Sequence, residues 1–73
     1  MNLDNLPLLK KAVIKNINCN KILKQRLYDL GVVEGEVVIV IRKAPFGGPF
    51  QIKIAKTTLL ISKKICKFIE VLY

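Results

Sequence analysis

The chain has 73 residues, of which 13 are Lys or Arg, 5 are Asp or Glu and none is His, giving a formal charge of +8. A chain of this length folds as one domain and buries only about 60% of the surface exposed by its unfolded state, which leaves little room for a deep substrate cavity. Because histidine is absent, Ser-His-Asp and Cys-His mechanisms are excluded, and we predict a single domain over residues 1–73 that is not an enzyme and holds no cofactor.

The N-terminal half predicts one short strand followed by one short helix. Residues Ala12–Ile17 form a β-branched, apolar run of the kind that strands favour. Asn20 can cap the next helix with its side-chain oxygen. The apolar residues that follow recur at i, i+4 and i+7 and form one stripe, made of Leu23, Leu27 and Leu30. Gly31 ends the helix, because the residue after a helix commonly adopts a left-handed conformation.

The C-terminal half predicts a meander of strands after a turn at Glu34–Gly35. The elements follow in this order: a strand at Glu36–Lys43, a loop at Ala44–Pro49, strands at Phe50–Ile54 and Thr57–Ile61, a helical turn at Ser62–Cys66 and a last strand with Phe68, Ile69 and Val71. Five short strands around a small core suit a closed or nearly closed barrel, which removes exposed sheet edges. We therefore predict a mostly β fold, a small SH3-like β-barrel with one short inserted α-helix.

The two cysteines, Cys19 and Cys66, form no C-x-x-C pair and have no histidine to activate them. We expect both to be free thiols with a structural role, and a disulfide or a shared metal is the weaker alternative. The carboxylates are scattered along the chain, so we predict no metal site and at most weak binding of iron(II).

The apolar residues are numerous but are not gathered into a membrane span. The longest apolar run, Val37–Ile41, is far shorter than the roughly 20 residues that a spanning helix needs. Residues Met1–Asp4 have no basic segment ahead of an apolar one, so we expect no leader and a cytoplasmic protein. Because apolar residues make up 52% of so small a domain, we also expect a partner or a second copy to cover part of them.

The charge of +8 has two interpretations. It can attract nucleic acid, anionic lipid or an acidic protein surface. Alternatively, it is a solvated surface rich in lysine, since Lys supplies 11 of the 13 basic residues. The composition leaves both interpretations open.

Two segments are candidate partner-binding sites. The first is the predicted helix end and the following turn, which would present Arg26, Tyr28, Leu30 and Gly31 to a partner. The alternative for this segment is structural, with Leu30 in the core, Gly31 as a helix cap and Arg26 merely solvated.

The second segment is the loop Ala44–Pro49. Its two prolines limit its conformations, so little ordering entropy is lost when it docks. Its candidate residues are Ala44, Pro45, Phe46, Gly47 and Pro49. Phe46 would serve as an aromatic anchor. The alternative is a plain hairpin connection in which Phe46 folds back over the mouth of the barrel.

The motifs occur in a characteristic order: Arg26-Leu27-x-x-Leu30-Gly31, then Gly35, a Val- and Ile-rich strand, Ala44-Pro45 with Gly47 and Pro49, and a closing Ile69-x-Val71. In this order and spacing, over essentially the whole chain, the sequence resembles the FeoA family of small ferrous iron transport proteins. The resemblance implies an SH3-like barrel at the inner face of the cell membrane, without catalytic activity or a tightly bound cofactor. It also implies an accessory or regulatory role through contact with FeoB, the large membrane transporter of ferrous iron that carries a GTP-binding domain.

Two alternatives remain. The same barrel occurs as the C-terminal domain of some iron-dependent repressors, so the chain could be a stand-alone relative of that domain. It could also be a small basic barrel that binds nucleic acid, with cations at Arg42–Lys43 and at Lys63-Lys64-x-x-Lys67. Against nucleic acid, aromatic residues are few, and we expect Phe50 and Phe68 to be needed in the core rather than as a stacking platform.

Overall fold

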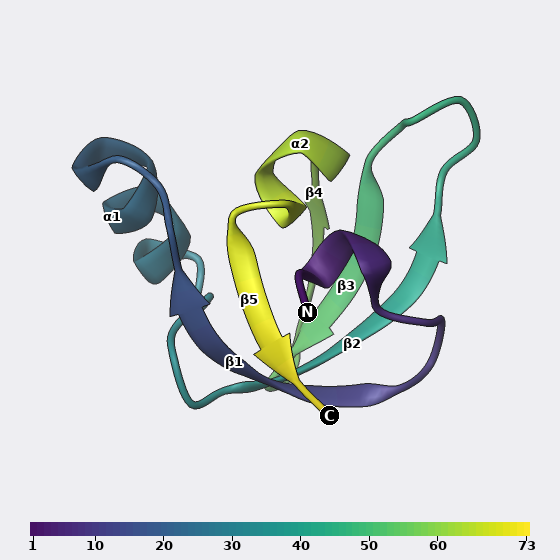
Figure 1. Cartoon of the computed structure of the whole chain (residues 1–73), viewed down its shortest axis with the longest axis horizontal. Helices are drawn as coiled ribbons and strands as arrows, with labels where there is room; N and C mark the ends of the chain where they lie inside the picture. The colour runs from purple at the N-terminus through teal and green to yellow at the C-terminus, as the bar shows by residue number, and fades with distance from the viewer.

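Five antiparallel strands form one sheet that curls around a single apolar core (Figure 1). The computed structural model describes every residue, 1–73. The strands are β1 (Lys11–Ile17), β2 (Val37–Lys43), β3 (Phe50–Ile54), β4 (Thr57–Ile61) and β5 (Ile69–Leu72), in the spatial order β4-β3-β2-β1-β5. The helical segments are η1, a 3-10 turn at Leu3–Asn5, α1 (Lys21–Asp29) and α2 (Lys63–Cys66). The predicted order of elements and the mostly β class are confirmed.

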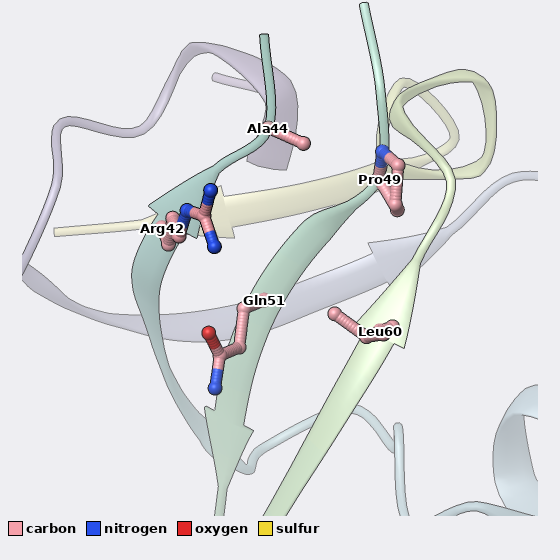
Figure 2. Close-up of a pocket in the computed structure, with 5 residues that line it drawn as sticks. All are labelled: Arg42, Ala44, Pro49, Gln51 and Leu60. Atoms are coloured by element: carbon pink, nitrogen blue, oxygen red, sulfur yellow. The ribbon is translucent and has the colours of Figure 1, made fainter.

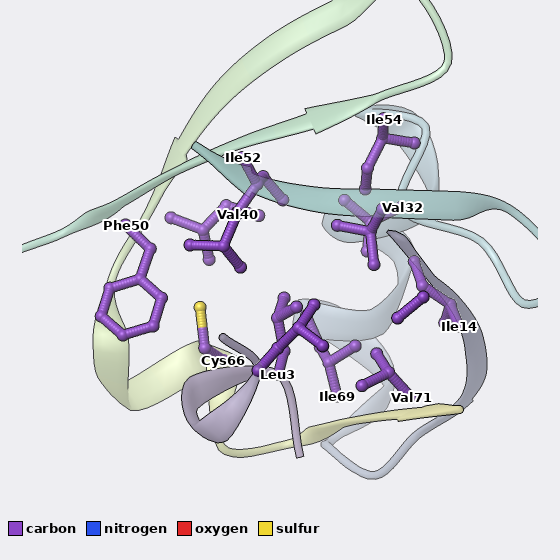
Figure 3. Packing of buried hydrophobic residues seen from close by; sticks show 14 of the residues in the cluster. Leu3, Ile14, Val32, Val40, Phe50, Ile52, Ile54, Cys66, Ile69 and Val71 are labelled. Carbon is purple, nitrogen blue, oxygen red and sulfur yellow. The ribbon is translucent and has the colours of Figure 1, made fainter. Parts of the chain in front are cut away.

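Most of the core is made of alternate residues of the strands, as period-2 patterning requires. Phe50, Ile52 and Ile54 of β3 point inward with side chains of the other strands (Figure 3). β1 departs from strict alternation because its pairing with β5 shifts between Ile14 and Asn16. This irregularity turns Ile17 into the core and leaves Asn16 in solvent. No polar or charged residue is buried.

The N-terminal segment is a core element that the sequence patterns do not predict. Leu3 and Leu6 are fully buried, and η1 packs against α2 and β5. A three-residue turn is too short to show a periodic apolar pattern, so Leu3 in the turn and Leu6 directly after it give no signal. The prediction for Phe68 is wrong, because its side chain is 38% exposed whereas that of Phe50 is buried.

The sheet does not close into a complete barrel. Its end strands, β4 and β5, do not pair with each other. Met1 and Asn2 cover the outer edge of β5, where the Val71 N–H donates to the Met1 carbonyl at 2.8 Å. β4 has β3 as its one neighbour. The expectation that closure removes exposed edges is therefore wrong at β4, because the chain turns through α2 after this strand instead of continuing the sheet.

Helix α1 begins and ends as its sequence predicts. The Asn20 side chain accepts a hydrogen bond from the Leu23 N–H at 2.8 Å. At the other end, the Gly31 N–H donates to the Tyr28 carbonyl at 2.9 Å and the Val32 N–H to the Leu27 carbonyl at 2.8 Å. This is a Schellman motif, and it needs Gly31 at φ +93°. With nine residues in α1, no helix of the structure is long and apolar enough to span a membrane.

The predicted apolar stripe of α1 is wrong at its last member. Leu27 is buried and Leu23 packs against the core, but Leu30 is 51% exposed. Leu30 is the C-cap residue, where the chain leaves the helix. Val32 takes the next core position instead, fully buried beside the end of the helix. A Schellman motif commonly brings its last residue back onto the helix in this way.

Candidate functional site

The loop Ala44–Pro49 projects from the end of the β2–β3 hairpin (Figure 1). The Ala44 N–H donates to the Pro49 carbonyl at 3.1 Å, and within that closure the Gly48 N–H donates to the Pro45 carbonyl at 3.1 Å. A Cβ atom added to Gly48 would lie 2.8 Å from the Ala44 Cβ, so only glycine fits there. Two prolines and two hydrogen bonds therefore hold this loop in one compact shape.

Phe46 stands at the tip of this loop, fully exposed. Its φ is +59° and that of Gly47 is +72°, the two positive values that a type I′ turn requires at its central residues. The left-handed conformation costs a residue with a Cβ about 1–2 kcal/mol. The alternative in which Phe46 folds over the mouth of the barrel is wrong, because the turn directs the ring into solvent.

A shallow pocket of about 190 Å³ adjoins the base of the loop on the outer face of the sheet (Figure 2). Ala44 and Pro49 form its rim, and side chains of three adjacent strands complete its lining, namely Arg42, Gln51 and Leu60. No carboxylate lies within 4.0 Å of Arg42, since the ion pairs of the molecule are elsewhere. The pocket thus offers a cation, an amide and an apolar surface made of Leu60, Ala44 and Pro49.

The outward face of α1 is the second exposed surface. Arg26 lies in solvent between two exposed apolar residues, Ile22 at 72% and Leu30 at 51% exposure. The three follow each other at intervals of four and so share one face of the helix. Sequence reasoning missed Ile22, although its spacing from Arg26 and Leu30 was a signal for this face.

Tyr28 is not displayed with them. Its hydroxyl donates to the Glu34 Oε2 at 3.0 Å, and the Lys24 Nζ lies 3.8 Å from the same oxygen. The hydrogen bond to Glu34 raises the pKa of the Tyr28 phenol above its usual value. Backbone and Tyr28 hydrogen bonds to its carboxylate lower the pKa of Glu34. Tyr28 thus ties the turn after Gly31 to the helix.

The structure does not bring the two candidate segments together. Helix α1 lies at one end of the long axis of the molecule and the β2–β3 loop at the other (Figure 1). The molecule measures 29 Å along this axis. Arg26 and Phe46 therefore belong to separate surfaces and do not line one site.

The cysteines are free, Cys19 partly exposed and Cys66 buried. Burial raises the pKa of the Cys66 thiol to about 12, so it stays protonated at neutral pH. No three His, Cys, Asp or Glu side chains gather in a group that could hold a metal ion. Weak binding of iron(II) remains a prediction.

The family model of the FeoA domain matches residues 1–72. The chain belongs to the FeoA family. The solution structure of FeoA from Chlorobium tepidum is 28% identical with a TM-score of 0.90, covering 97% of this chain and 68% of that chain. Iron(II) transport protein A from Clostridium thermocellum is 31% identical with a TM-score of 0.91, and covers 97% of this chain and 44% of that chain. No curated protein matches the chain.

A third FeoA structure bears on the fold. FeoA from Stenotrophomonas maltophilia, solved in complex with zinc and described as a prokaryotic SH3 domain protein, is 31% identical with a TM-score of 0.82. It covers 97% of this chain and 88% of that chain. The SH3-like fold and the association of the FeoA family with ferrous iron transport are thereby confirmed.

Metal-dependent repressors share the fold. A manganese-dependent transcriptional repressor has a TM-score of 0.85 at 13% identity, and the match covers 94% of this chain and 39% of the repressor. At this identity the likeness concerns the barrel alone.

Proposed function

We propose that this FeoA-family chain is a cytoplasmic accessory protein of ferrous iron uptake that acts by binding the cytoplasmic part of a FeoB-type membrane transporter. The observation that carries the proposal is the family match over residues 1–72. The structure supports a binding role, because Ile22 and Leu30 at the end with α1 and Phe46 on the β2–β3 loop are exposed, and these two elements lie at opposite ends of the long axis (Figure 1).

The loop Ala44–Pro49 supplies the anchor in this proposal. Phe46 is fully exposed on a loop closed by two hydrogen bonds, so its docking orders little more than the phenyl ring itself. Aromatic residues on such rigid supports carry a large share of the energy of small interfaces. The net charge of +8 attracts an acidic surface and makes the association rate fall as salt rises.

The test is an affinity pull-down from gently solubilised membranes near physiological salt, with nuclease added and the bound proteins identified by mass spectrometry. We expect the wild-type chain to recover a large GTP-binding ferrous transporter. We expect Phe46→Ala to recover much less of it, because the anchor is lost. Tyr73→Ala is the matched control, since it removes an exposed aromatic side chain at the C-terminus, away from the loop (Figure 1), and is expected to bind like the wild type.

Two results contradict the proposal. One is the absence of any transporter from the wild-type sample. The other is recovery of ribosomal or nucleoid proteins alone, lost on nuclease treatment, which would favour the basic nucleic-acid-binding barrel.

A further inference from the structure

The outer edge of β4 is open. Thr57–Ile61 pair with β3, and no other backbone hydrogen bond involves these five residues. The pairing with β3 runs without a bulge, so nothing twists the edge away from an approaching chain. The opposite end of the sheet is covered, because Met1 and Asn2 lie along β5. The β4 edge therefore presents the unpaired N–H and C=O groups that an extended chain can join.

The geometry of the β3–β4 hairpin identifies these groups. The strands are joined by the two residues Ala55 and Lys56, next to the pair Ile54 and Thr57. In an antiparallel pair, residues that exchange hydrogen bonds alternate with residues whose backbone groups face away. The pair that closes a two-residue turn, here Ile54 and Thr57, exchanges hydrogen bonds. By alternation, Thr58 and Leu60 therefore direct their N–H and C=O groups to the open edge.

The charges around this edge have no partners. The strand itself is uncharged and includes the exposed Leu60, while Lys56 precedes it and Lys63 and Lys64 follow it closely. The ion pairs of the molecule are Lys15–Glu70 and Lys24–Glu34, so these three lysines lack a carboxylate within 4.0 Å. An uncharged strand thus lies between lysines that have no carboxylate partner at either end.

Charge decides which occupant fits. A second copy paired antiparallel to β4 would place Lys56 of each copy near Lys63 and Lys64 of the other, and each copy carries +8. Like charges at such distances destabilise a sheet pair. A segment with carboxylates at both ends would instead meet each of these lysines with the opposite charge, so every one of these contacts would be attractive. The lysines therefore disfavour self-pairing and favour an acidic strand.

We propose that β4 is a docking edge for an extended acidic segment of a partner protein, which joins the sheet as a sixth strand. The segment has a β-branched or apolar centre that lies beside Thr58 and Leu60. Its carboxylates flank this centre and pair with Lys56, Lys63 and Lys64. Leu60 also lines the pocket at the base of the loop (Figure 2), so a side chain of the added strand meets apolar surface there. This inference does not depend on the transporter contact.

The test uses the full chain, labelled with ¹⁵N, and a capped nonapeptide of sequence Glu-Glu-Val-Thr-Val-Thr-Val-Glu-Glu. We expect amide shifts centred on β4 and slower hydrogen exchange at Thr58 and Leu60. The same peptide with Lys in place of Glu is expected to bind at least about tenfold more weakly. A peptide N-methylated at alternate residues is expected not to bind, because it cannot form the ladder.

Variants of the chain test the backbone and the charges separately. Thr58→Pro removes an outward N–H at an edge position where proline is tolerated, and we expect it to lose peptide binding. Thr58→Val keeps the N–H and is expected to bind like the wild type. If Thr58→Pro fails to fold, the double variant Lys56→Glu/Lys64→Glu decides: it should bind the Glu peptide about fivefold more weakly or worse, and the Lys peptide more tightly.

Three results would overturn the proposal. The first is a set of shifts centred on α1 or on the loop Ala44–Pro49 instead of β4. The second is equal affinity of the Glu and Lys peptides. The third is protection of the Thr58 and Leu60 amides in the peptide-free protein as its concentration rises, since the occupant would then be a second copy. None of these results depends on recovery of a transporter, so the two proposals can fail separately.

Discussion

Phe46 combines full exposure with a left-handed backbone, φ +59°, which bulky residues rarely adopt. An exposed ring contributes little to the core, and its conformation costs stability, so folding alone does not account for a phenylalanine here. A contact of the ring with a partner, as proposed above, would account for it. Substitutions of Phe46 are therefore expected to change the stability of the fold and the binding of a partner independently.

Phe46→Asn tests this separation. Asparagine tolerates the left-handed region, so we expect the free energy of unfolding to rise by about 1 kcal/mol. Phe46→Ala, the control, keeps a Cβ and is expected to leave stability nearly unchanged. Denaturant titration followed by circular dichroism measures both. A loss of more than about 1 kcal/mol in either variant would mean that the ring packs against the fold.

At the scale of elements, the strands are predictable because alternation and β-branched runs are local properties. Phe50, Ile52 and Ile54 read as one buried face, and the structure agrees. The cap at Asn20 and the stop at Gly31 are local as well. By contrast, the exposure of Leu30 depends on where the chain turns after the helix. The short η1 segment gives no periodic signal at all.

For the candidate partner-binding sites, the sequence predicts which segments are involved but not which side chains they expose. The prolines and glycines mark the loop Ala44–Pro49 in the sequence, but the direction of Phe46 follows from the turn type. Tyr28 looked available because its partner, Glu34, lies beyond the end of the helix. The open edge of β4 could not be foreseen, since strand order is a property of the whole sheet.

The contact between Tyr28 and Glu34 makes the attachment of α1 sensitive to acid. The pKa of Glu34 is lowered in the folded state by hydrogen bonds from the backbone and from Tyr28. A carboxyl group whose pKa is lower in the folded state stabilises the fold at any pH above its unfolded-state pKa. This stabilisation is lost as the pH falls through the folded-state pKa.

We expect Tyr28→Phe to raise the pKa of Glu34 toward its ordinary value and to speed hydrogen exchange in α1. A carboxyl-detected NMR titration measures the pKa, and amide exchange at neutral pH measures the helix. Gln25→Ala is the control, because it removes a side-chain bond within α1, to Asp29, without touching Glu34. An unchanged Glu34 pKa in Tyr28→Phe would contradict this assignment.

At the scale of the whole molecule, exposed apolar residues gather on the outer face of the sheet. Val13 of β1 is the register partner of both Leu72 in β5 and Val37 in β2. All three side chains are at least 40% exposed. This row is a continuous apolar surface, separate from the β4 edge, that a second copy can cover.

We expect concentration-dependent self-association through this row, stronger at high salt. Each copy carries +8, and salt screens the repulsion between copies beyond about 10 Å at 0.1 M ionic strength. Sedimentation measures the association, and Val13→Lys should reduce it. Gln25→Lys adds the same charge at an exposed position of α1, outside the row, and serves as the control. Sedimentation of the chain as a monomer at high concentration and high salt would contradict this prediction.

The separation of α1 from the β2–β3 loop has a geometric consequence. These surfaces lie at opposite ends of a body 29 Å long. A single flat patch on a partner can touch one of them but not both. Engagement of both ends requires either two partner bodies, with this chain as the spacer between them, or one partner that wraps around the barrel. In the first arrangement the rigid sheet would hold the two partner bodies at a fixed distance from each other, set by the length of this chain's fold.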